Sequence, residues 1–311
     1  MRKRNWREYN KKLVQRGSLT FLIDPKIMKT LALKTQKKRK GRPLEFSDQL
    51  ILLLLMIKIH CKMPYRMLEG FTRFFFEQFK KIKVPTYSLT CKRAKGLSTK
   101  LPKLSSRRPS TVIIDATGIK VQGEGEWKVK IHGKGRPRKW IKLHVAIDER
   151  TQEIVGEISL DATVDDGKAF PKVMQRVKGR LKTVIGDGAY DARDVRDLIR
   201  EKGGKCLIPP PSNAVCHGTD VERDDAIKVI RALGGDKVAK SIWGKLSGYS
   251  RRALVETPFS GYKKMFGERA FSRTQERIIL AKQHARRISV FNNFLNYQLR
   301  ACGAVWNRYY A

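Results

Sequence analysis

The sequence predicts an α/β core preceded by a smaller helical region. Short apolar segments rich in β-branched residues begin after residue 110 and then alternate with helical patterns, whereas the preceding part carries helical patterns alone. A chain of 311 residues is also long enough for one sizeable core and a smaller domain. We therefore expect a basic N-terminal arm over 1–43, a helical domain over 44–109, and an α/β domain over 110–311 that ends in helices.

Three short helices are expected before the boundary. Ser47 is suited to cap a helix that ends near His60, a second helix should lie around residues 65–79, and a third should begin near Thr90. The basic residues of the third helix are typical of a helix-turn-helix module, although helix triplets occur in proteins of many functions. Residues 101–110, rich in Pro, Ser and Arg, indicate an interdomain linker.

The region after residue 110 predicts strands first, and then strands that alternate with helices. In order, the expected elements are strands at 111–119, 126–132 and 140–148, a helix at 167–177, a strand at 182–186, a helix at 192–202 and a strand at 205–208. A three-stranded antiparallel meander followed by β-α-β crossovers is the order of ribonuclease-H-like domains. The last third is helical in pattern and should end in a long amphipathic helix over 275–301.

The charge of the chain indicates a polyanionic partner. It has 67 Lys and Arg against 29 Asp and Glu, a formal net charge of +38. Such a surface binds DNA or RNA tightly at low salt, because each neutralised phosphate releases counterions. The run Lys37-Lys-Arg-Lys40 is either a flexible basic linker that follows phosphates or a solvated loop.

Cysteine usage and hydropathy bear on the compartment. The five cysteines are scattered and contain no CxxC pair, which favours a reducing cytosol over a disulfide framework or a zinc site. The longest apolar run, residues 50–57, is too short to cross a bilayer, and the N-terminus lacks the apolar segment of a secretory signal. We expect a cytoplasmic protein with no membrane role.

Two aspartates stand in apolar surroundings where a carboxylate needs a partner. Asp115 lies in Val-Ile-Ile-Asp-Ala-Thr-Gly, a segment apolar enough for a central strand. A bound cation would compensate its charge, and hydrogen bonds from backbone amides would do so equally well. Asp187 ends a later predicted strand between Gly186 and Gly188, which would let a phosphate backbone approach closely.

Other aspartates nearby have simpler explanations. Asp191 is expected to be the N-cap of the helix that follows, with Asp194 in its first turn. Asp165 and Asp166 precede another predicted helix in the same way. We therefore assign none of these four to a site.

A third group of polar residues lies on one helical face. Tyr249, Arg252, Glu256 and Lys263 fall within a wedge of roughly 60° on an expected helix. An acid, two cations and a phenol on one face suit a metal ion and phosphates together, and a solvated helical face is the alternative. Pro258 and Gly261 within this segment would be able to kink the helix after Glu256.

With these residues in view, the sequence resembles the bacterial insertion-sequence transposases of the DDE type, in the group called family five. The resemblance extends over nearly the whole chain. Its motifs are Asn5-Trp-Arg-Glu-Tyr-Asn10 with Arg16-Gly-Ser-Leu-Thr20, Asp115-Ala-Thr-Gly-Ile-Lys120, Gly125-Glu-Trp-Lys128 with His132-Gly133, Trp140-Ile-Lys-Leu-His144, Asp187-Gly-Ala-Tyr-Asp191, Leu207-Ile-Pro-Pro210, and Tyr249-x2-Arg252-x3-Glu256-x6-Lys263. The last motif is the signature tetrad of this transposase superfamily.

The resemblance implies that Asp115, Asp187 and Glu256 form a catalytic, metal-binding triad on a ribonuclease-H-like fold. Ligands that are all oxygen suit Mg²⁺ or Mn²⁺, and two such ions would activate a water and later the freed 3′-hydroxyl. Hydrolysis would free the end of the element, and transesterification would join that end to target DNA.

The resemblance and the charge pattern also suggest DNA contacts. The candidates are Tyr249, Arg252 and Lys263 of the tetrad, and Lys134, Arg136 and Arg138 in a basic hairpin between two tryptophans. Arg252 suits a bidentate phosphate contact and Lys263 a point-charge contact. The hairpin is otherwise a solvated turn.

The implied partners are terminal inverted repeats, target DNA and further copies of the chain assembled on DNA, in the bacterial nucleoid. Two other functions remain open at this point. A non-catalytic DNA-binding regulator would account for the charge but not for the three acids. A ribonuclease-H-like DNA nuclease would account for the acids but not for the tetrad.

Overall fold

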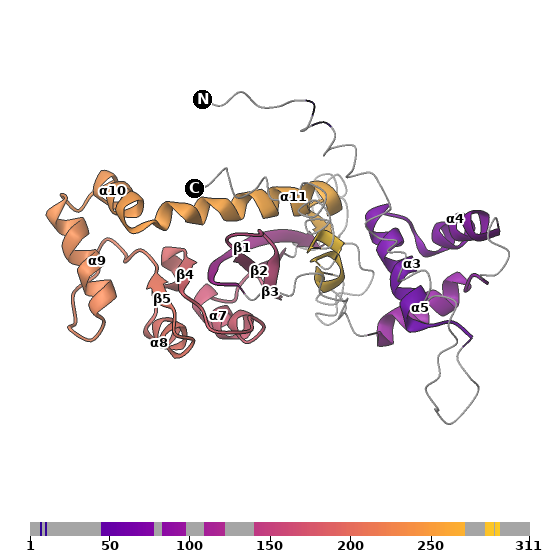
Figure 1. Ribbon diagram of the computed structural model, residues 1–311, viewed down its shortest axis with the longest axis horizontal. Coiled ribbons are helices and arrows are strands. Elements are labelled where there is room, and N and C mark those ends of the chain that lie inside the picture. Colours follow the sequence, from indigo (N-terminus) through magenta and orange to yellow (C-terminus); the bar gives the residue numbers. More distant parts are fainter. Residues whose placement is uncertain are drawn as a thin grey trace, which may run out of the picture. The chain divides into compact units, whose positions relative to one another are not determined.

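The computed structural model describes residues 45–77, 83–97, 109–121, 140–270, 284–288 and 290–292, together with residues 7 and 10. Its contacts divide the chain into two compact units (Figure 1), Met1–Ser105 with His284–Ala311 and Ser106–Gln283. Each unit is described by itself. The domain boundaries expected from the sequence remain predictions.

The first unit contains the three predicted helices, α3 (Asp48–His60), α4 (Tyr65–Glu77) and α5 (Tyr87–Gly96). Ser47 caps α3 as expected, since its hydroxyl accepts the backbone N–H of Leu50 at 3.1 Å. The third helix begins earlier than Thr90, because Thr86 is its N-cap and accepts the N–H of Leu89. A helix-turn-helix function for this unit remains a prediction.

Part of the long helix expected near the C-terminus is described. Residues 284–288 and 290–292 are helical, and the Arg286 guanidinium donates to the carbonyl oxygen of Ala94 on α5. The other residues of the predicted 275–301 helix lie outside the described part of the chain.

The second unit is built on one mixed sheet. Its strands are β1 (Thr111–Val121), β2 (Trp140–Asp148), β3 (Ile154–Asp161), β4 (Thr183–Gly186), β5 (Lys205–Leu207) and β6 (Arg269–Ala270). The order is β3-β2-β1-β4-β5, and β6 pairs with β1. The first three strands are antiparallel, whereas β4 and β5 run parallel to β1. An antiparallel meander followed by parallel crossovers is the predicted ribonuclease-H-like arrangement.

One strand of the meander was not predicted from the sequence. The third antiparallel strand is β3, which we had not predicted, and it pairs with β2 from Ile141↔Asp161 onward. The strand expected at 126–132 lies outside the described residues. The missed strand is at the edge of the sheet and its residues are mostly half-buried, so their apolar pattern is weak.

The edge of β1 has an opening that matters for the site. Because β2 pairs with β1 from Val112 to Lys120, β4 and β6 must share the other edge of β1. The pairing with β4 ends at Ile114, and the pairing with β6 begins at Lys120. Between them, residues 115–119 have no strand partner on that edge among the described residues.

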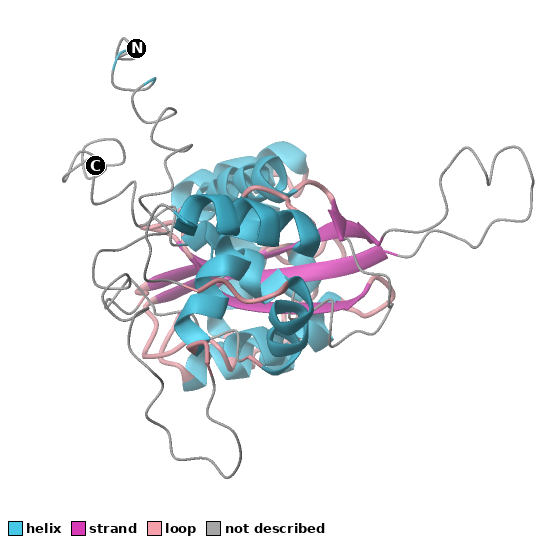
Figure 2. Cartoon of the chain, turned by 90° about the vertical axis from the view of Figure 1, so that its right-hand side faces the viewer, coloured by secondary structure: helices cyan, strands magenta, loops and turns pink. Residues whose placement is uncertain are grey.

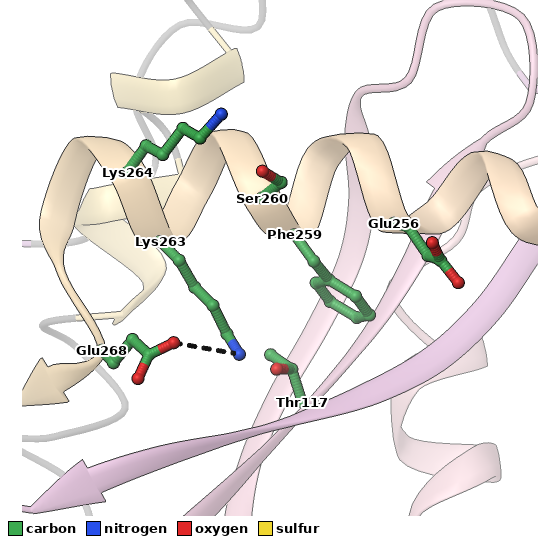
Figure 3. Close-up of a pocket in the computed structure, with 7 residues that line it drawn as sticks. All are labelled: Thr117, Glu256, Phe259, Ser260, Lys263, Lys264 and Glu268. Atoms are coloured by element: carbon green, nitrogen blue, oxygen red, sulfur yellow. Dashed lines mark ion pairs between the residues drawn. The ribbon is translucent and has the colours of Figure 1, made fainter.

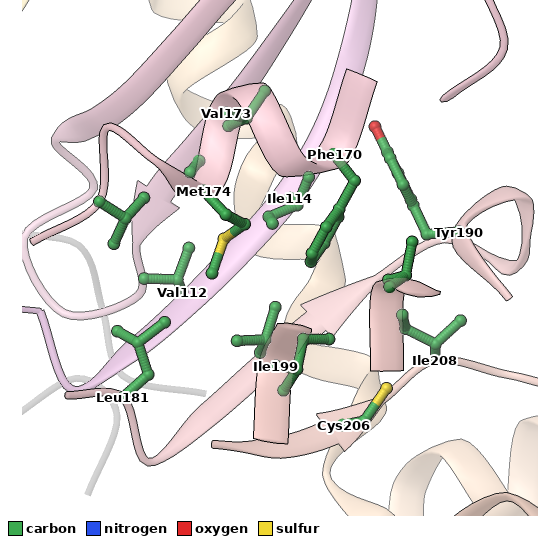
Figure 4. Packing of buried hydrophobic residues seen from close by; sticks show 14 residues of the cluster. Val112, Ile114, Phe170, Val173, Met174, Leu181, Tyr190, Ile199, Cys206 and Ile208 are labelled. Atoms are coloured by element: carbon green, nitrogen blue, oxygen red, sulfur yellow. The ribbon is translucent and has the colours of Figure 1, made fainter. Parts of the chain in front are cut away.

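One face of the sheet is covered by α7 (Asp166–Met174) and α8 (Arg193–Glu201). Their apolar residues form a buried cluster with β1 and β4 (Figure 4) that contains Val112, Ile114, Phe170, Val173, Val195 and Ile199. In this cluster the ring of Phe170 lies 5.8 Å from that of Tyr190. Asp165 caps α7 as predicted, since its carboxylate accepts the N–H of Gly167.

The last helix of the unit lies on the side of the sheet opposite α7 and α8 (Figure 1), and helices cover both faces (Figure 2). It ends a series of helical segments that follow β5. They are α9 (Val221–Ala232), α10 (Lys237–Ser247), the 3-10 helix η3 (Tyr249–Val255) and α11 (Glu256–Phe266). The single helix expected around the tetrad is thus two segments. The kink predicted after Glu256 does not interrupt α11, because Pro258 lies in its first turn, where the missing N–H is tolerated. Within the described residues, no helix has the length and apolarity needed to span a membrane.

Candidate active site

Asp115 and Asp187 lie side by side because two parallel strands are in register. Ile114 on β1 is paired with Gly186 on β4, so the next residue along each strand is an aspartate. Asp187 follows the last residue of β4, and the chain then turns through η2 (Gly188–Tyr190). Both carboxylates are therefore located where the edge of β1 becomes open.

Gly186 owes its identity to packing. A Cβ at this position would lie 3.3 Å from Ile208 and 3.4 Å from the ring of Tyr190. A side chain would therefore crowd the core beneath the turn. Our expectation that the glycine keeps space for a phosphate backbone has no support in these contacts.

Arg252 joins the two aspartates. Its Nη2 donates to Oδ2 of Asp115 at 3.1 Å and to Oδ2 of Asp187 at 3.2 Å. The other oxygen of Asp115, Oδ1, accepts the backbone N–H of Ala116 at 2.8 Å. The hydrogen bond from a backbone amide, one of the two explanations considered for the Asp115 carboxylate, is thus present, whereas a bound metal ion remains a prediction.

The electrostatic balance at Asp115 reflects these neighbours. Burial raises the pKa of the Asp115 carboxyl above its ordinary value, while the Ala116 N–H and the Arg252 guanidinium lower that pKa. The charge of Asp187 raises the pKa further. Two adjacent carboxylates therefore need a cation nearby if both are to stay ionised.

Glu256 is the exposed first residue of α11 and lines an open pocket of about 510 Å³. Figure 3 shows its lining residues, which are Thr117 from β1, Glu256, Phe259, Ser260, Lys263 and Lys264 from α11, and Glu268. Thr117 lies two residues after Asp115 on the same strand, so its side chain is on the same face of the sheet. The pocket is therefore beside the aspartate pair.

The three acids do not form a compact cluster. Among the described residues, no group of three or more His, Cys, Asp and Glu residues is close enough to hold a metal ion. The donor chemistry nevertheless fits a hard divalent cation, because Asp115 and Asp187 offer oxygen ligands and already hold one cationic group between them. These two residues, with Glu256 as the third acid, are the ones that could hold a metal.

Comparison with known proteins agrees with this architecture. The family described as "Transposase DDE domain" matches residues 106–281, and a second family with the same description matches residues 14–124. The chain belongs to the DDE transposase family.

Two solved structures are also similar to the chain. One is the piggyBac transposase synaptic complex with hairpin DNA, with 11% identity, coverage of 94% of this chain and 76% of that chain, and a TM-score of 0.42. The other is the Mos1 strand transfer complex, with 12% identity, coverage of 73% and 80%, and a TM-score of 0.22.

The remaining tetrad residues of this DDE transposase have different surroundings. The ring of Tyr249 packs against Trp243 on α10, with 5.5 Å between centroids, and burial raises the pKa of its phenol. Lys263 lies in the pocket, where its Nζ is 3.7 Å from Glu268. Lys263 is thus accessible, whereas Tyr249 is partly taken up by packing.

The basic hairpin cannot be placed. Lys134, Arg136 and Arg138 fall within residues 122–139, which lie outside the described part of the chain. Their contact with DNA remains a prediction.

Sequence reasoning missed a polar group under the aspartates. Asp166 forms an ion pair with Lys142 on β2, and its Oδ1 lies 3.7 Å from Nδ1 of the fully buried His144. The same nitrogen is 3.4 Å from the Tyr190 hydroxyl. The charge of Asp166 contributes to the raised pKa of Asp115. The motif Trp140-Ile-Lys-Leu-His144 contained two of these residues, but we gave neither a role.

Asp191 also has a different role from the one predicted. The N-cap of α8 is Ala192, and Asp191 instead forms ion pairs with Arg196 and Arg223. Asp194 is in the first turn of α8, as predicted. The Asp191 ion pairs tie the turn after Asp187 to α8 and α9.

Proposed function

We propose that this DDE transposase binds the ends of an insertion sequence, cleaves DNA strands there and joins the freed 3′-hydroxyl ends to target DNA. The observation that carries the proposal is the pair Asp115 and Asp187, adjacent on parallel strands and next to a pocket lined by Glu256 and two lysines. The tetrad motif and the N-terminal motifs further suggest the bacterial family-five group of insertion sequences.

Two divalent ions, Mg²⁺ or Mn²⁺, would be held by Asp115, Asp187 and Glu256, since this chemistry uses a pair of metal ions. Such ions supply Lewis acidity at the scissile phosphate and lower the pKa of an attacking water. The protein's own contribution is to hold Asp115 within β1 and Asp187 directly after β4, so that the register of the sheet sets the spacing of these two carboxylates.

The cations of the site would position the DNA backbone. Arg252 presents a guanidinium suited to phosphate oxygens, and Lys263 extends an ammonium into the pocket. Tyr249 would contribute a hydroxyl at the rim of the site. Lys134, Arg136 and Arg138 would grip DNA beside it, and the overall charge of +38 would provide affinity independent of sequence.

The proposed partners are the terminal inverted repeats of its own element, target DNA, and other copies of the chain assembled on DNA. A protein of this kind would work in the bacterial cytoplasm, at the nucleoid. The proposed reaction requires neither a nucleotide cofactor nor a covalent enzyme intermediate.

The decisive experiment is cleavage and strand transfer on labelled DNA that carries the ends of the element, with Mg²⁺ or Mn²⁺. Wild type should give cleaved and joined products, and Glu256→Gln should give neither while retaining DNA binding. Glu201→Gln makes the same chemical change at an exposed glutamate of α8, outside the candidate site, and serves as the matched control.

Each alternative function has its own signature in this assay. Binding with no products from wild type would favour a non-catalytic regulator. Cleavage without joining would favour a nuclease. Normal cleavage by an Asp187→Ala variant would refute the proposed triad.

A further inference from the structure

The Arg252 guanidinium occupies the space that a metal ion would need between the aspartates. One nitrogen, Nη2, contacts Oδ2 of Asp115 and Oδ2 of Asp187 at 3.1 and 3.2 Å. In the described part of the chain, the Nε of Arg252 is buried and has no hydrogen-bond partner. The side chain is therefore held at the site chiefly by its charge and by the two carboxylates.

Both carboxylate oxygens of Asp115 already accept a hydrogen bond. Oδ1 accepts the N–H of Ala116. Oδ2 accepts a hydrogen bond from Nη2 of Arg252, which also donates to Asp187. A Mg²⁺ or Mn²⁺ ion bound by both aspartates would need oxygens about 2.0–2.2 Å away. A guanidinium that contacts the same two oxygens blocks that position by volume and repels the ion by charge.

We infer that Arg252 keeps the aspartate pair closed to divalent cations until DNA binds, and that its transfer from the carboxylates to a DNA phosphate opens the metal site. DNA and cation then bind cooperatively, since the phosphate removes the group that competes with the metal. This inference rests on the proposed function for the identity of the metal ligands, and it adds an order of events. By linkage, the cation must strengthen DNA binding by the same factor.

The neighbouring Arg251 provides a matched control. It has the same charge and belongs to the same 3-10 helix, but its Nη1 pairs with both carboxylate oxygens of Glu149, at 2.9 and 3.1 Å. Arg251→Gln therefore removes one charge from the segment and leaves the Arg252 contacts with the aspartates in place.

The test measures the affinity of the DNA-free protein, with its whole sequence, for Mn²⁺. Electron paramagnetic resonance reports the concentration of free Mn²⁺ in each titration. We expect Arg252→Gln to bind Mn²⁺ at least about tenfold more tightly than wild type, and Arg251→Gln to differ from wild type by less than about threefold. Adding a short DNA duplex should increase the Mn²⁺ affinity of wild type more than that of Arg252→Gln. A sample with DNA alone corrects for the Mn²⁺ that the DNA itself binds.

Equal Mn²⁺ affinities for the two variants would overturn the inference, as would an Arg252→Gln protein that binds Mn²⁺ more weakly than wild type. A further variant with Arg252→Gln and Asp187→Asn should lose the gain, and retention of the gain would show that the ion binds elsewhere. Cleavage assays separate this result from the proposed function. If wild type cleaves DNA but Arg252→Gln does not bind Mn²⁺ more tightly, only the proposed exchange of Arg252 is refuted. If Arg252→Gln binds Mn²⁺ more tightly in a way that requires Asp187, but wild type does not cleave DNA, only the proposed transposase activity is refuted.

Discussion

Asp191→Asn should destabilise the second unit more than a substitution that removes an exposed ion pair. The side chains of Asp191 and Arg196 are each only 4% exposed, and Arg223 adds a second guanidinium with Nε 3.2 Å from Oδ2. Removing one partner of a buried pair usually costs about 3–5 kcal/mol, because it leaves a buried charge uncompensated. Asp220 lies 3.6 Å from Arg196 and offers partial compensation. We therefore expect a loss near the lower limit, about 3 kcal/mol.

Hydrogen exchange followed by mass spectrometry measures this loss locally. A drop of about 3 kcal/mol in opening free energy should accelerate exchange of the most protected amides of β4 and α8 by roughly a hundredfold. The control is Asp197→Asn on α8, since Asp197 is 51% exposed and bonds Arg200 at 2.9 Å. That change should cost no more than about 1 kcal/mol. Equal effects of the two substitutions would refute the reasoning.

Three further predictions concern packing, pH and DNA. Gly156→Ala would place a Cβ 2.9 Å from the carbonyl oxygen of Val173, so we expect a loss of about 1–3 kcal/mol and a lower thermal midpoint by circular dichroism; an unchanged midpoint would contradict this. Burial lowers the pKa of His284 from 6.5 to about 3. Because the charged form is disfavoured in the fold, the stability that His284 contributes is complete above pH 6.5. It should fall by up to about 1.4 kcal/mol per pH unit as the pH drops toward 3, as measured by denaturant titrations, and His284→Asn should remove this dependence. Lys263→Gln should lower the slope of log DNA affinity against log salt by about one, and an unchanged slope would exclude a phosphate contact by this lysine.

The elements predicted correctly are those whose patterns are local. Ser47 followed by an apolar run predicts α3, because the cap and the buried helix are both determined by consecutive residues. The central strand β1 is predictable for a similar reason, since its residues before Asp115 are almost fully buried. In contrast, β3 escaped prediction because an edge strand buries only part of each face.

The candidate site was predictable in its acids but not in its contacts. Asp115 lies within an apolar strand and Asp187 directly follows one. Their proximity depends on the parallel register of β1 and β4, which the two short segments cannot reveal alone. The sequence predicted a phosphate contact for Arg252, yet its described partners are the two aspartates. The contact joins residues far apart in sequence, so no local pattern contains it.

The opening in the edge of β1 connects the fold to the proposed order of events. If β4 continued past Gly186, its backbone would pair with residues 115–119 and exclude both η3 and any nucleic acid strand from that edge. Because β4 stops there, the chain turns at Asp187, and η3 contacts both strands at the gap. The same gap that admits Arg252 to the aspartates must then admit a DNA phosphate to Arg252. Arg252 reaches the aspartates at this open edge, so the proposed transfer of its guanidinium to a phosphate needs no rearrangement of the sheet.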